Sequence, residues 1–182
     1  MHPDDLQHPL SVYPGSGLSG LARPDGVGRG DTWTGMFGSF MPCIAHGEGP
    51  VEITGVTWSS TPDLEPLSVD VYARTFVAPD ESPIGQLYGT PENPSRSHIT
   101  PFDDKFVRAS VDEPCHQEGD PPSGPIDEIV FSVKGKSSGA HLRDVRFTYT
   151  TPDGKEHIVE NDWDFYLCGP KVPEETGCWR HL

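Results

Sequence analysis

Short segments in which apolar and polar residues alternate, separated by proline and glycine, are the strongest constraint on the fold of this chain. The alternation is clear over residues 51–58, 67–74, 129–133, 145–149 and 163–167. A period of two is typical of a β-strand with one buried face, because successive side chains point to opposite faces of the sheet. Between the last two segments, Thr151–Gly154 has the composition of a tight hairpin turn.

Seven or eight short strands of this kind predict an all-β fold. Glycine and proline make up 40 of the 182 residues, which disfavours long helices and favours many turns. We expect an antiparallel β-sandwich of immunoglobulin-like architecture, with a closed β-barrel as the alternative. Trp58 does not stand in the relation to Cys43 that a true immunoglobulin domain requires, so only the architecture is predicted.

Residues 1–50 are rich in glycine and proline and differ from the rest of the chain. Such a segment buries little apolar surface, so we interpret it as an extended N-terminal arm preceding a single β-sandwich domain over 51–182. The arm could wrap its own domain, or contact a partner protein or a second copy of the chain. Its large apolar residues, together with one in the C-terminal tail, are the interface candidates: Trp33, Phe37, Phe40 and Trp179.

The four cysteines are predicted to form two disulfides. None belongs to a C-x-x-C pair, so a zinc cluster is disfavoured. Four cysteines allow three pairings; the favoured one joins Cys168 to Cys178 across a proline- and glycine-containing loop, and Cys43 to Cys115. Disulfides indicate an extracellular or cell-envelope location, with the signal sequence outside this numbering, since Met1–Asp5 has no signal-peptide character. Four free thiols in a cytoplasmic protein are the alternative.

The formal net charge of −15 limits the choice of partner. A strongly acidic chain repels phosphate backbones, so nucleic acid is excluded, whereas a basic protein or a cation is attracted. No apolar run approaches the roughly 18 residues of a membrane-spanning helix, so no membrane span is expected.

Residues with the spacing of a catalytic, metal or cofactor site are not found, and we predict no catalytic residue and no cofactor. The eight histidines include no pair at strand or helix spacing for one ion. The weaker metal candidates are His46 and His116, which a Cys43–Cys115 disulfide would bring together, and Asp162 and Asp164 on one strand face. There is no G-x-S-x-G motif of a serine hydrolase, although a hydrolase that uses a pair of carboxylates stays an alternative.

The order of strands and cysteines over residues 43–168 resembles that of small exported bacterial β-sandwich proteins, most of them uncharacterised. The shared pattern is a cysteine before the strand at Gly49–Ile53, a middle cysteine, the Val145–Tyr149 strand with its Pro-Asp-Gly turn, and a last strand ending at Cys168. The resemblance implies a secreted or envelope location and no known activity, and the tail with Cys178 departs from it. We therefore expect a non-enzymatic protein-binding or assembly module. A metal- or carbohydrate-binding module or hydrolase with a site in its loops is the alternative.

Overall fold

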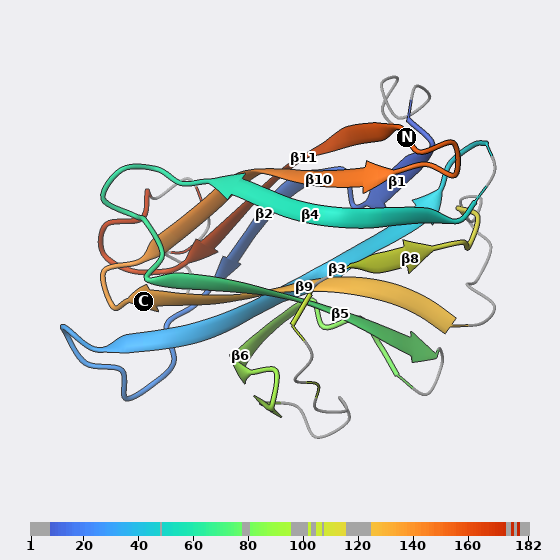
Figure 1. Ribbon diagram of the computed structural model, residues 1–182. Coiled ribbons are helices and arrows are strands. Elements are labelled where there is room, and N and C mark those ends of the chain that lie inside the picture. The colour runs from blue at the N-terminus through green and yellow to red at the C-terminus, as the bar shows by residue number, and fades with distance from the viewer. Residues whose placement is uncertain are drawn as a thin grey trace.

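The computed structural model describes residues 8–47, 49–77, 81–95, 102, 105–106, 108–115, 125–173, 176 and 178. These residues form eleven β-strands and no α-helix, which confirms the all-β prediction (Figure 1). In chain order the strands are β1 (Leu10–Tyr13), β2 (Ser16–Leu21), β3 (Thr32–Ile44), β4 (Val51–Ser59), β5 (Ser68–Val77), β6 (Gln86–Thr90), β7 (Asn93–Pro94), β8 (Ala109–Val111), β9 (Pro125–Lys136), β10 (Ala140–Thr150) and β11 (Glu156–Leu167).

The strands are arranged in two curled sheets that face each other. One sheet has the order β5-β9-β3-β6-β7, with β1 also pairing with β3, and the other has the order β2-β11-β10-β4-β8. Figure 1 shows β4, β10 and β11 in the upper layer and β3, β5 and β9 in the lower layer. All neighbours are antiparallel except β2 and β11, which run parallel.

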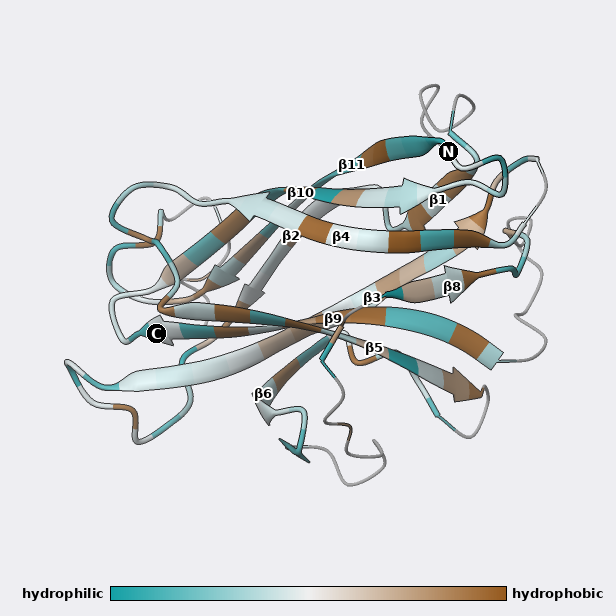
Figure 2. Cartoon of the chain, in the orientation of Figure 1, coloured by the Kyte–Doolittle hydropathy of each residue, from teal (hydrophilic) through white to brown (hydrophobic). Residues whose placement is uncertain are grey.

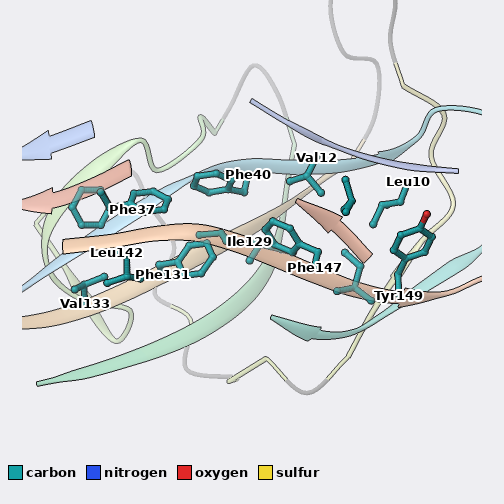
Figure 3. Packing of buried hydrophobic residues seen from close by; sticks show 14 of the residues in the cluster. Leu10, Val12, Phe37, Phe40, Ile129, Phe131, Val133, Leu142, Phe147 and Tyr149 are labelled. Atoms are coloured by element: carbon teal, nitrogen blue, oxygen red, sulfur yellow. The ribbon is translucent and has the colours of Figure 1, made fainter. Parts of the chain in front are cut away.

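The main hydrophobic core lies between the sheets and draws side chains from both. Buried Val145, Phe147 and Tyr149 alternate with the less buried Arg146, Thr148 and Thr150 along β10, and Figure 2 shows hydrophobic and hydrophilic bands along β9 and β10. Phe37, Phe40 and Phe131 (Figure 3) meet Phe165 at the centre, with ring centroids of Phe40 5.5 Å from Phe131 and 5.2 Å from Phe165. Because burying each such ring stabilises the fold by about 1.5–3 kcal/mol, this aromatic cluster holds the two sheets together.

The described part of the predicted N-terminal arm is built into both sheets. Residues 8–47 contain β1, β2 and the thirteen-residue β3, which lies between β9 and β6. This adds strands to the seven or eight expected from alternation alone. Trp33, Phe37 and Phe40 are buried in the core, so their prediction as interface anchors is wrong.

Close packing, and not chain flexibility, explains the glycines of β3. A Cβ atom on Gly35 would lie 2.5 Å from Leu21 Cδ2, and one on Gly38 would lie 2.4 Å from Glu128 Oε1. Only glycine fits where neighbouring side chains approach the backbone this closely. The composition that suggested an extended arm therefore reflects a central strand with neighbours on both faces.

Two disulfides are present, in the favoured pairing. Cys43 at the end of β3 is joined to Cys115 after β8, with Cα atoms 4.8 Å apart, and Cys168 after β11 is joined to Cys178, at 5.3 Å. We call these the long-range and the C-terminal disulfide. Disulfides of this kind are typical of proteins that fold in an oxidising compartment.

The described residues include no helix long and apolar enough to cross a membrane.

Candidate binding groove

Two adjoining hollows open where the sheets part, between β4 and β5. One has a volume of about 350 Å³ and the other about 320 Å³. Both are lined by Trp58 of β4 and Val69 of β5, so they form one continuous depression, which we call the β4–β5 groove. Its other lining residues are Ser59, Ser60, Glu65 and Pro66 at one end and Thr54, Gly55, Val56, Asp70, Val71, Lys105 and Phe106 at the other.

The upper side of the groove is a strand edge without a partner in the described chain. On one edge, β4 pairs with β10 from Glu52 to Ser59. On the other edge, β8 is only three residues long and reaches no further than Ile53. Among the described residues, none pairs with the far edge of Thr54–Ser59, which borders the groove.

The lower side of the groove is the outer edge of β5, the last strand of its sheet. Phe106 N–H donates to the Val71 carbonyl at 2.8 Å, and Lys105 forms an isolated bridge with Tyr72. Backbone groups of alternate residues in a strand face the same edge, so those of Val69 face outward like the Val71 carbonyl. Lys105 and Phe106 occupy this edge at Val71 and Tyr72, so the part of the β5 edge that faces the groove is at Val69, across from the edge of β4.

The floor of the groove is apolar and continuous with the core. Trp58 is half-buried, and its ring meets Phe131 edge-on, with centroids 6.5 Å apart and planes at 90°. Val56, Val69, Val71 and Phe106 also pack against the core from this side. A ligand in the groove would meet a rigid apolar surface, because its floor is fixed from below by the close-packed interior.

The rim of the groove carries charge. Lys105 Nζ lies 2.6 Å from Asp70 Oδ1, and this hydrogen bond raises the pKa of Lys105 above its usual value. Both side chains are exposed, so the pair contributes little to stability. Glu65 lies at the opposite end. With the net charge of −15, the surroundings of the groove favour a cationic ligand over an anionic one.

Away from the groove, a buried ion pair fixes the outer face of the first sheet. Arg74 of β5 and Glu128 of β9 are register partners, and Arg74 Nε donates to Glu128 Oε2 at 2.7 Å. Only 6% of the arginine side chain and 0% of the glutamate side chain are exposed. Glu128 Oε1 also accepts from the backbone N–H groups of Ser39, at 2.5 Å, and Ile84, at 2.8 Å.

This ion pair organises two neighbouring pieces of chain. Ser39 has a φ of 70° and lies in the bulge of β3 between Phe37 and Phe40, so the carboxylate holds a strained turn in place. Arg74 Nη2 also donates to the Ser82 carbonyl at 2.7 Å, which anchors the segment before β6. The alternation over residues 67–74 puts Arg74 on the polar face of its strand and does not reveal the cluster, because residues distant in the sequence cover that face.

A second polar cluster, also missed, joins the loop after β4 to the outer face of the second sheet. Thr61 Oγ1 lies 2.7 Å from His141 Nδ1, and His141 Nε2 lies 2.9 Å from Asp164 Oδ1. The imidazole is buried and stacks on Tyr166, with centroids 4.1 Å apart and planes at 6°. A hydroxyl, an imidazole and a carboxylate form the relay of serine hydrolases, but there the carboxylate contacts Nδ1 and the hydroxyl contacts Nε2. The reversed arrangement around a buried, stacked ring acts here as a structural clamp.

Of the four metal candidates, His46, Asp162 and Asp164 lie in the described chain. Asp164 is engaged by His141, while Asp162 is exposed beside it on β11. His46 is half-buried, and its Nε2 atom has no hydrogen-bond partner among the described residues. His116 and the interface candidate Trp179 lie outside the described residues. No group of three His, Cys, Asp or Glu side chains suited to a metal ion occurs in the part of the chain that the structure covers.

The strand edges at the groove are a candidate binding feature that sequence reasoning did not reach. Alternation identifies β4 and β5 as strands, but neither their outer neighbours nor the short length of β8 can be deduced from periodicity. Comparison with known proteins adds no assignment: no protein-family model, no curated protein and no solved structure matches this chain.

Proposed function

We propose that this protein is an exported, non-enzymatic binding module of immunoglobulin-like β-sandwich architecture, and that its β4–β5 groove receives an extended segment of a partner polypeptide. The observation that carries the proposal is the pair of strand edges facing an apolar groove. An extended peptide can add to such an edge through main-chain hydrogen bonds, while shallow pockets select its side chains. The two disulfides support folding in an oxidising compartment outside the cytoplasm.

The groove chemistry indicates what kind of segment would bind. Trp58 and Val69 line both hollows, so an apolar side chain directed to the floor would bury the most surface there. In an extended peptide every second side chain points the same way, so apolar residues at alternate positions fit this floor. Asp70 and Glu65 near the two ends favour lysine or arginine at the flanks of the segment.

Selection from a random peptide library displayed on phage, against the folded full chain, tests the proposal. We expect selected peptides to be extended, alternately apolar and flanked by basic residues. N-methylation of alternate backbone amides should abolish their binding, because these amides pair with a strand edge. Failure to select any saturable binder would overturn the proposal. The proposal would also be overturned if selected peptides bound unchanged when N-methylated at the odd-numbered amides and when N-methylated at the even-numbered amides.

Trp58→Ala tests whether the selected peptides bind in the β4–β5 groove, and Trp163→Ala is its matched control. Both tryptophans are half-buried, and Trp163 meets Phe40 edge-on with centroids 6.3 Å apart, much as Trp58 meets Phe131. A comparable loss of stability is expected from each. Truncating a hot-spot tryptophan costs 2 kcal/mol or more of binding, so Trp58→Ala should weaken peptide binding by about 30-fold. Equal effects of the two variants on affinity would place the peptide elsewhere.

A carbohydrate ligand is the second candidate, because Trp58 presents an indole ring in an open groove. A sugar would stack on this ring without using the strand edges. Binding of oligosaccharides on a glycan array that is lost in Trp58→Ala, combined with no peptide selection, would favour this candidate over the first.

A further inference from the structure

The edge strand β2 lacks the features that keep exposed strand edges from pairing with other chains. It is the last strand of its sheet, and no strand in the described chain pairs with its outer edge. Natural edge strands are protected by charged residues, by proline or by being very short. β5 carries Asp70 and Arg74, β7 contains Pro94, and β8 has three residues. In contrast, β2 has six residues, Ser-Gly-Leu-Ser-Gly-Leu, without charge or proline.

The backbone groups of β2 that face outward can be assigned. Gly15 C=O accepts from Asp162 N–H at 3.0 Å, and Leu21 C=O accepts from Cys168 N–H at 2.9 Å. Odd-numbered residues therefore direct their backbone groups toward β11, and the N–H and C=O groups of Ser16, Leu18 and Gly20 face the open edge. The Leu18 side chain is 47% exposed, one of five large hydrophobic side chains exposed to this degree in the described residues.

The charge of the molecule indicates which partner can pair with the outer edge of β2. Each molecule has a net charge of −15, so two copies repel each other wherever charged surface meets charged surface. Residues 9–22 contain no Asp, Glu, Lys, Arg or His. A neutral edge is therefore the place where a second copy can pair strand to strand without bringing like charges into direct contact, because the nearest carboxylates, those of Asp162 and Asp164, lie one strand away on β11.

We infer that β2 is a self-association edge, through which two copies of this chain pair antiparallel about a two-fold axis at Leu18. In this register, Leu18 faces its own equivalent and Ser16 faces Gly20 of the second copy, so the outward backbone groups of both strands are satisfied. The two five-stranded sheets then become one continuous sheet. Self-complementary contact of this kind is the rule for two-fold dimers. The inference is independent of the β4–β5 groove, which lies on the opposite edge of the same sheet.

The strength of the dimer should depend on concentration and salt. Six residues a side form a smaller contact than the roughly 800 Å² per partner of a stable complex, so a weak and reversible dimer is expected. Raising the salt concentration screens the repulsion between the two acidic molecules and should strengthen the association.

Sedimentation equilibrium of the full chain, over a series of protein and salt concentrations, tests this inference. The wild type should shift reversibly from the 19.9 kDa of one chain toward twice that mass. Leu18→Glu places two carboxylates across the axis and should raise the dimer dissociation constant by about tenfold or more. Val77→Glu is the matched control, because Val77 is 49% exposed on the edge strand of the other sheet, and it should dimerise like the wild type.

A cross-linking measurement covers the case in which Leu18→Glu perturbs folding. Residues on the axis of such a pair lie close enough for a disulfide, so Leu18→Cys should form a covalent dimer in air while Val77→Cys should not. Wild-type protein that stays monomeric at high protein and salt concentration would overturn the inference. A dimer that Leu18→Glu does not weaken and Leu18→Cys does not cross-link would overturn it as well.

Discussion

Replacing Glu128 by glutamine should destabilise the protein more than any other single isosteric change among its charged residues. The side chain is completely buried and accepts three hydrogen bonds, one from Arg74 and two from backbone N–H groups. Glutamine keeps the size of the side chain and one carbonyl acceptor. It removes the negative charge, so the buried guanidinium of Arg74 is left without its counter-charge.

The expected loss of unfolding free energy follows from the burial of the Arg74–Glu128 ion pair. Removing one partner of a buried ion pair costs about 3–5 kcal/mol, because the other charge stays desolvated. For a chain of this length that loss lowers the melting temperature by on the order of 10 °C. Arg74→Met combined with Glu128→Gln should cost less than the sum of the two single changes, since neither variant side chain carries a charge that needs compensation.

Urea unfolding with the disulfides intact measures these differences, and Glu160→Gln provides the matched control. Arg146 Nε lies 2.8 Å from Glu160 Oε1 in another cross-strand pair, but the side chains are 52% and 64% exposed. Exposed pairs contribute 0–1 kcal/mol, so this control should change stability little. If Glu128→Gln costs no more than Glu160→Gln, the reasoning from burial is refuted.

Two further predictions concern the disulfides and the hairpin turn between β10 and β11. Loop entropy assigns about 4.4 kcal/mol to the long-range disulfide, which spans 72 residues, and about 2.7 kcal/mol to the C-terminal one, which spans 10. Paired Cys→Ser variants should lose unfolding free energy in that order in chemical denaturation, and the reverse order would contradict this estimate. In the turn, hydrogen bonds from Lys155 and Thr151 lower the pKa of Asp153 from 3.8 to about 2. Its small stabilisation is present above pH 3.8 and lost as the pH falls toward 2. Carboxyl NMR titration should show the pKa rising in Lys155→Ala, and an unchanged value would contradict that cause.

The sequence predicted the strands in which apolar and polar residues alternate, and it failed at β3, where both faces are covered. β10 and β11 alternate regularly, and the turn between them closes as expected, with Gly154 N–H donating to the Thr151 carbonyl at 2.8 Å. β3 does not alternate, because it is buried on both sides and contains glycines where neighbours approach. Its composition alone is indistinguishable from that of an extended arm.

The candidate sites were less predictable than the fold because they depend on which strands are neighbours. The disulfide pairing present is the one favoured from the loop around Cys168 and Cys178, although the sequence alone allowed three pairings. The groove, the Arg74–Glu128 pair and the Thr61–His141–Asp164 cluster each join segments that are far apart in the sequence. No local sequence pattern indicates which distant segments contact each other, so only the three-dimensional structure reveals these contacts.

The parallel pairing of β2 with β11 has a consequence for the order in which the chain can fold. Ser16 lies opposite Asp162 and Leu21 opposite Leu167, so β2 can pair only after β11, which lies far later in the sequence, has been made. β3 likewise waits for β9, since Phe37 pairs with Phe131. Contacts this distant in sequence slow folding, because loop-closure entropy must be overcome before they form. The sheet that contains β2 is therefore expected to form only after β11 has been made, later than the sheet of β5, β9 and β3, whose last strand in the sequence is β9.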